Sequence, residues 1–267
     1  MAFGSQVTTR GLTRRSAALA LELVVPAAIV VAWWLASSGS TSLYFPPLSK
    51  IVSAFRQIWL FSHVGPDAGP SLEHLAAGYL LASVSGVVVG VAIGLLPSVG
   101  EALAPILEAL RAVPALALVP AAVLILGIGP SMQIGVIVSA AVWPVLLNTA
   151  DGVRGIDPQV NDVARSYRIG WRDRLLRMVL RAASPQIVAG MRTALSIAVV
   201  MIVFSEMVGS TNGIGYQLLQ SQRAFDIPGM WSAMILLGIL GYLLNILFRG
   251  FERGVLAWHR GMRGASD

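Results

Sequence analysis

The sequence predicts an all-α polytopic membrane protein with six transmembrane helices. Apolar residues make up 56% of the 267 residues and charged residues only 12%, too few to cover the surface of a soluble domain. The mean hydropathy is +0.75. Apolar stretches recur at about the 20-residue length that crosses a bilayer. These stretches are 17–37, 75–96, 112–128, 132–149, 186–208 and 230–248.

Glycine and proline separate the central stretches. A short apolar helix is expected at 103–110, just before the third span. The third and fourth spans are joined by Gly127-Ile128-Gly129-Pro130, which combines backbone freedom with a missing N–H and therefore predicts a tight turn.

Arginine placement predicts the orientation. Seven arginines lie between residues 154 and 181, and inserting them at the bilayer centre would cost roughly 20 kcal/mol, so this segment forms a loop. Sixteen of the 19 basic residues, including Arg111 and Arg192, fall on one side of the six spans, and Lys50, Arg56 and Arg223 fall on the other. The positive-inside rule then places both termini in the cytoplasm.

Four regions follow from these spans. Residues 1–16 form a cytoplasmic segment, 17–71 the first span with an outer amphipathic segment, 72–250 the core with a cytoplasmic loop at 151–185, and 251–267 a cytoplasmic tail. Thr13-Arg14-Arg15-Ser16 is also similar to a twin-arginine export signal. Glu22 within the following apolar run favours a retained anchor helix.

The second span carries small residues at every fourth position. This spacing places them on one helix face and lets another backbone approach closely. Packing within the chain is the favoured interpretation, and a subunit interface is the alternative. The residues are Gly78, Ala82, Gly86, Gly90 and Gly94.

Few side chains could carry chemistry. Glu206, followed by Met207, lies near the outer end of the fifth span, where it is either part of a pathway or gate or a solvated capping group. Three dispersed histidines and no cysteine predict no metal site, and no catalytic residue is assigned. No phosphate-binding loop of the G-x-x-x-x-G-K-[ST] type occurs, so we expect no ATP hydrolysis by this chain alone. Its net charge of +6 is attributed to topology and lipid rather than to nucleic acid.

The arginine-rich loop is expected to fold as two helices. Asp157 or Asn161 can cap the first helix, with Pro158 in its first turn. Gly170 then breaks the chain, a second helix spans 171–180, and Pro185 begins the fifth span. An apolar face on the first helix suits either lipid headgroups or a cytoplasmic partner, and the pattern alone does not choose. That face comprises Val160, Val163, Ala164 and Tyr167.

These residues carry a family resemblance. Asp162-Val163-Ala164-Arg165-Ser166-Tyr167, Gly170, Val179-Leu180 and Pro185 resemble the EAA loop of type I ABC importer permeases. Arg168 stands where that motif has glycine, and Arg181 where a first proline is common. Five further segments resemble the sulfonate/nitrate/taurine subgroup in order along the chain. They are Tyr44-Phe45-Pro46-Pro47-Leu48-Ser49, Ala112 to Ala117, Gly127-Ile128-Gly129, Trp143-Pro144 through Asn148-Thr149, and Glu206-Met207-Val208-Gly209 with Gly213-Ile214-Gly215-Tyr216.

The resemblance implies a type I ABC importer transmembrane domain in a bacterial cell membrane. Such a permease pairs with a second copy, with two cytoplasmic subunits that bind ATP and magnesium, and with an extracytoplasmic substrate-binding protein. It moves a small solute such as a sulfonate, taurine or nitrate, and needs no cofactor of its own. The residues implied to couple to the ATPase are Asp162, Val163, Ala164, Arg165, Tyr167 and Gly170, and those implied to line the pathway or gate are Asn148, Glu206 and Met207.

Two other classes of protein fit the sequence less well. A self-sufficient secondary transporter or channel would need an intramembrane ion-binding cluster or inverted repeats, and the sequence shows neither. A purely structural scaffold is disfavoured because the family segments are distributed along most of the chain.

Overall fold

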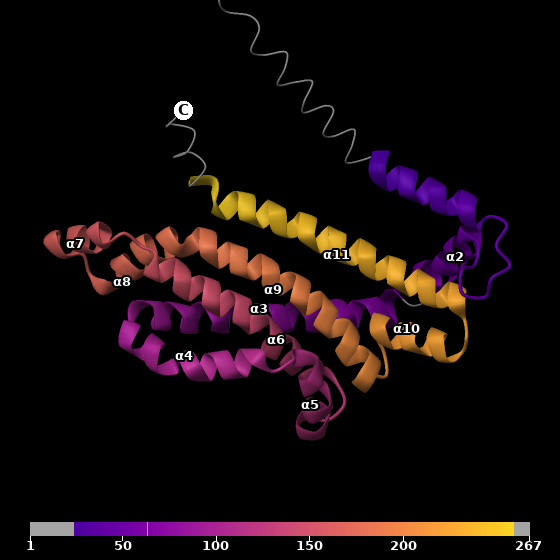
Figure 1. Ribbon diagram of the computed structural model, residues 1–267, viewed down its shortest axis with the longest axis horizontal. Coiled ribbons are helices and arrows are strands. Elements are labelled where there is room, and N and C mark those ends of the chain that lie inside the picture. Colours follow the sequence, from indigo (N-terminus) through magenta and orange to yellow (C-terminus); the bar gives the residue numbers. More distant parts are fainter. Residues whose placement is uncertain (1–23, 63, 259–267) are drawn as a thin grey trace, which may run out of the picture.

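The computed structural model describes residues 24–62 and 64–258 as an elongated all-helical molecule (Figure 1). The expected segment 1–16, the start of the first span and the last nine residues lie outside the described residues. Four helical segments are long and apolar enough to span a membrane: Gly65–Leu95, Pro130–Arg154, Trp171–Gly209 and Ile227–Val255. A helix pair bent by 79° makes up to five. The predicted count of six spans is therefore not confirmed. Within the expected first span, residues Val24–Ser37 form a shorter apolar helix.

The long helices run along the long axis of the molecule (Figure 1). We call the end that carries α7 and α8 the arginine-rich end; α2 and α10 lie at the opposite end. The α-helices are α2 (Leu48–Phe55), α3 (Gly69–Leu95), α4 (Pro97–Ala112), α5 (Val119–Leu126), α6 (Pro130–Arg154), α7 (Pro158–Ser166), α8 (Trp171–Asp173), α9 (Leu180–Gly209), α10 (Ile214–Arg223) and α11 (Ile227–Val255). Shorter π or 3-10 segments are η1 (Arg56–Ser62), η2 (Val64–Ala68), η3 (Ala115–Leu118) and η4 (Arg174–Val179).

Helices α3, α6 and α9 form the core. Gly78, Gly86, Gly90 and Gly94 of α3 are buried against α6, where an added Cβ would lie 2.6–2.8 Å from Ile137, Val145, Leu146 or Val153. Ala82, on the same face, is fully buried in the main apolar cluster. The small residues at every fourth position therefore let the backbones of α3 and α6 approach closely within one chain.

The expected third span, 112–128, is shorter than predicted: its helical part is Ala115–Leu126, which is too short to cross a membrane by itself. The chain instead forms α4, which extends well beyond the expected 103–110, and then bends by 79° into η3 and α5. Val113 takes an extended conformation (ψ 122°), as residues before proline favour, and Pro114 has no N–H to continue the helix. The turn expected at 127–130 is present, with positive φ at Gly127 and Gly129.

The helix break expected at Pro185, before the fifth span, is absent. Pro185 lies inside α9, and the helix continues back through η4 to Trp171, forming a 39-residue helical segment. Proline cannot donate to the carbonyl of Arg181, but the Ser184 hydroxyl donates to that carbonyl at 2.9 Å. Because this local bond replaces the missing one, the helix passes the proline without ending.

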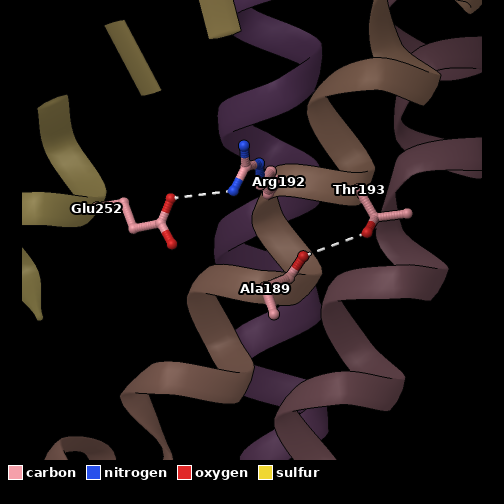
Figure 2. Close-up of polar contacts among 4 residues, drawn as sticks. All are labelled: Ala189, Arg192, Thr193 and Glu252. Carbon is pink, nitrogen blue, oxygen red and sulfur yellow. Dashed lines mark hydrogen bonds and ion pairs between the residues drawn. The ribbon is translucent and has the colours of Figure 1, made fainter. Parts of the chain in front are cut away.

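Helix α11 is peripheral to this core. Only 17% of its apolar stretch is buried, compared with 39–44% in the other three long helical segments. Twelve residues after the start of α9, Arg192 points toward Glu252 of α11, with Nη1 and Oε2 3.4 Å apart, while Thr193 donates to Ala189 O within α9 (Figure 2). Such a half-exposed ion pair contributes about 1 kcal/mol or less, so it adds little to the stability of the contact between α9 and α11.

Candidate functional site

Helix α7 is a short helix with a defined start and stop. Asp157 caps its first turn by accepting a hydrogen bond from the Gln159 N–H at 2.9 Å. At the other end, the Ile169 N–H donates to Ala164 O and the Arg168 N–H to Arg165 O, the paired bonds of a Schellman motif. Arg168 occupies the left-handed position of this motif, with φ +50°. Arginine in place of the motif's glycine therefore still allows α7 to end here, at the cost of a left-handed backbone conformation.

The expected apolar face of α7 is divided between the interior and the surface. Ala164 is 2% exposed inside the chain, which differs from the expectation that it meets a partner. Val163 is 49% exposed and Tyr167 79% exposed. Asp162, Arg165 and Gly170 are exposed beside them. The surface available to a partner is thus Val163 and Tyr167 with their charged neighbours.

The second half of the loop presents further apolar surface. Trp171 is 70% exposed, and the Arg172 guanidinium lies 5.5 Å from its ring centroid. Arg177 pairs with Asp173 at 3.1 Å across one helical turn. Large apolar side chains exposed among so many charges mark an interaction surface.

Glu206 belongs to a buried cluster at the opposite end of the molecule. It is 1% exposed; its Oε1 accepts from Ser71 Oγ at 2.5 Å and its Oε2 from the Gly215 N–H at 2.8 Å. The Gly213 N–H donates to Asp67 Oδ1 at 2.8 Å, and the Ile214 N–H to Ser71 Oγ at 3.0 Å. The N–H groups of Gly213, Ile214 and Gly215 at the start of α10 are therefore bonded, two of them by carboxylates placed where the helix dipole favours negative charge.

Two glycines make this cluster possible. A Cβ on Gly213, whose φ is +113°, would collide with the Glu206 carboxylate, and one on Gly215 would collide with Val203 O. Glu206 consequently ties α9 to α10 and α3, and it borders a small cavity of about 20 Å³. Of the other two residues expected in a pathway, Met207 is half-buried, and Asn148 donates to Pro144 O in its own helix at 2.8 Å.

A large cavity lies at the bend between α4 and α5. It has a volume of about 690 Å³ and is bounded by α4, η3, α6 and α9. Its lining is mostly apolar, with the polar groups of Arg111, Ser139 and Trp143 as exceptions. From the sequence, Arg111 was expected only to help set the topology; the signal for a cavity here was Pro114, three residues later, where the chain turns.

Comparison with known proteins places this helical arrangement in a family. A family model for "binding-protein-dependent transport system inner membrane component" matches residues 82–256, about two thirds of the chain. The chain belongs to this family. It is a permease subunit of an ABC importer, a multi-pass membrane protein, and subunits of this kind are not themselves enzymes.

Curated relatives of the permease match along most of its length. It is 29% identical to the putative aliphatic sulfonates transport permease SsuC of Bacillus subtilis, over 91% of this chain and 88% of that protein. It is 31% identical to the nitrate import permease NrtB of Leptolyngbya laminosa, over 88% and 85%. It is 32% identical to the bicarbonate transport system permease CmpB of Synechococcus elongatus, over 85% and 86%.

A solved structure shares the fold. The methionine ABC transporter MetNI, in an inward-facing conformation, superposes with a TM-score of 0.61 at 19% identity, covering 74% of the permease and 97% of the MetNI chain. The predicted fold of an ABC importer transmembrane domain is confirmed.

Proposed function

We propose that the permease forms the transmembrane pathway of a bacterial importer for a small oxyanion, driven by ATP hydrolysis in cytoplasmic partner subunits. Two copies line the pathway, each docks one ATP-binding subunit, and an extracytoplasmic binding protein delivers the solute. Both termini and the arginine-rich end face the cytoplasm, in keeping with the positive-inside rule. The permease itself holds neither ATP nor magnesium.

The substrate class rests on the names of the relatives. Aliphatic sulfonate, nitrate and bicarbonate differ in size and geometry, but each is a small anion whose charge is spread over oxygen atoms. An oxyanion is therefore the property that these assigned substrates share.

The observation that carries the coupling proposal is the exposed tip of α7. Tyr167 is 79% exposed at the end of a helix that is capped at both ends and backed by buried Ala164. A partner that covers Tyr167 and Val163 gains a desolvated aromatic anchor on a helix that cannot unwind easily. Asp162 and Arg165 lie beside this anchor and can form polar contacts with the partner. A rigid contact transmits ATP-driven movement of the partner to the permease. With a loose contact, the free-energy difference that nucleotide creates between the inward- and outward-facing states would not reach the permease.

Copurification and ATPase measurements test this proposal. A tagged permease, expressed with its neighbouring transport subunits, should retain a subunit that carries a phosphate-binding loop; a secondary transporter should not. Tyr167→Ala should reduce binding-protein-stimulated ATPase and uptake by about tenfold or more, as loss of an interface anchor does.

Tyr242 provides the matched control. It is also a tyrosine, 68% exposed, but it lies on α11 away from the arginine-rich loop. Tyr242→Ala should leave stimulated ATPase near the parent level. Equal activities for the parent and both variants would show that Tyr167 is not the coupling anchor.

A further inference from the structure

Arg111, whose side chain is exposed, lies farther along the helical body than its place between two predicted spans indicates. Helix α4 starts at Pro97 at the arginine-rich end and runs back alongside α3 (Figure 1). Fourteen residues separate Pro97 from Arg111, and at 1.5 Å per residue this is about 21 Å along the helix. Arg111 thus lies beside the bend rather than at the end of the molecule.

The neighbours of Arg111 on α6 give the same depth. Arg111 lines the cavity at the bend together with Trp143 and Leu147, and Arg154 ends α6 at the arginine-rich end. Trp143 and Leu147 precede Arg154 by eleven and seven residues, or about 16 and 10 Å along the helix. A charge at such a depth is costly to keep in an apolar environment and usually marks a pathway.

Arg111 has no charge partner among the described residues. Glu108, Asp151 and Arg154 line a smaller adjacent cavity of about 170 Å³ that Arg111 also borders, but neither carboxylate lies within ion-pair distance of Arg111. On the larger cavity, Arg111 faces apolar groups, the Ser139 hydroxyl and the Trp143 indole. The Trp143 N–H also lacks a hydrogen-bond acceptor within the described part of the chain. The cavity therefore offers donors and a positive charge, but no anion.

We propose that Arg111 binds the charged group of an oxyanion as it passes through this cavity, which makes Arg111 a specificity residue of the permease. A guanidinium presents parallel N–H donors that match two oxygens of a sulfonate, nitrate or bicarbonate. A lysine would keep the charge but lose the paired donors. The inference deepens the proposed function and rests on it.

A charge-selective labelling experiment tests this proposal without knowledge of the natural substrate. The permease contains no cysteine, so Ser139→Cys gives it a single thiol in the cavity that Arg111 lines. Ser139 bonds only to Val136 O of its own helix, so the substitution is mild. In the assembled complex, the permease band is labelled with 2-sulfonatoethyl methanethiosulfonate, an anionic sulfonate, or with its cationic trimethylammonium counterpart.

The ratio of the two labelling rates reports the local charge. Adding Arg111→Gln should lower the anionic-to-cationic ratio about tenfold, because each reagent responds to the lost charge in the opposite sense. Arg111→Lys should keep most of the ratio, and it also serves if the glutamine variant does not fold. Arg249→Gln removes an exposed arginine from α11 and should leave the ratio unchanged.

Two results would overturn the proposal. One is a ratio that stays within twofold of the parent in Arg111→Gln, and the other is a thiol at position 139 that neither reagent labels in any nucleotide state. ATP-driven uptake of nitrate, bicarbonate and ethanesulfonate is measured on the same preparations. An unchanged ratio with intact uptake rejects the role of Arg111 alone, whereas the expected drop without ATP-driven uptake of any anion supports the site and rejects the importer.

Discussion

Gly90→Ala should destabilise the permease through the contact between α3 and α6. The added Cβ would lie 2.6 Å from Leu146 O and 2.7 Å from Thr149 Cβ, whereas ordinary contacts begin at 3.4 Å. The helices must therefore separate by 3.4 − 2.6 = 0.8 Å at this point. Neither a backbone carbonyl nor a β-carbon can rotate away, so we expect the upper part of the overpacking range, about 3 kcal/mol.

The helix propensity of alanine opposes this cost. Replacing an interior helical glycine by alanine gains about 1 kcal/mol, which leaves a net loss of about 2 kcal/mol for Gly90→Ala. Gly241→Ala on α11 is the matched control, because nothing lies within 4 Å of its added Cβ. Both variants receive the propensity gain, so the difference between them isolates the collision.

Thermal unfolding in detergent measures that difference. At about 2–4 °C per kcal/mol for a chain of this size, Gly90→Ala should melt about 6–12 °C below Gly241→Ala. Equal melting temperatures would refute the claim that α3 and α6 pack without room for a single methyl group.

Two further predictions concern the ends of the molecule. Arg168→Gly removes the strain of an arginine in the left-handed conformation, which costs about 1 kcal/mol. Amide exchange at residues 163–169 should therefore slow about fivefold, and unchanged exchange would mean that this turn is not strained. Glu206→Gln replaces one of two buried acceptors by a donor and should cost about 1–3 kcal/mol in thermal unfolding. The exposed Glu101→Gln is its control, and an equal loss in both would contradict the role given to the Glu206 cluster.

The sequence predicted well those features that depend on spacing and local backbone chemistry. Small residues at every fourth position of α3 predicted its close approach to another helix, and glycines at 127 and 129 predicted the turn before α6. Asp157 was one of two candidate caps for α7, and its hydrogen bond to the Gln159 N–H confirms it.

The two prolines show where such reasoning reaches its limit. Pro114 and Pro185 both stand within stretches of helix-forming residues, yet the chain bends at Pro114 and stays helical through Pro185. The difference depends on compensation: the Ser184 hydroxyl bonds the carbonyl that Pro185 leaves free, whereas Val113 becomes extended before Pro114. Sequence spacing alone does not distinguish these outcomes.

Tertiary contacts decided the remaining features. Helix α10 is short and rich in glutamine, so it lacks the length and apolarity that identify a span. The bonds that fix its start come from Asp67, Ser71 and Glu206. Asp67 and Ser71 precede the residues they bond by more than 140 positions in the sequence. Likewise, periodicity placed Val163, Ala164 and Tyr167 on one face, but only packing shows that Ala164 is buried and Tyr167 is exposed.

Cross-linking from α7 tests the coupling proposal most directly. Because the permease contains no cysteine, Tyr167→Cys provides one thiol for a photoreactive maleimide, and Tyr242→Cys provides its control on α11. In the intact complex, the probe at position 167 should form an adduct with the ATP-binding subunit, and the probe at position 242 should not. An intact complex in which position 167 yields no such adduct, or no more than position 242, would contradict docking through α7.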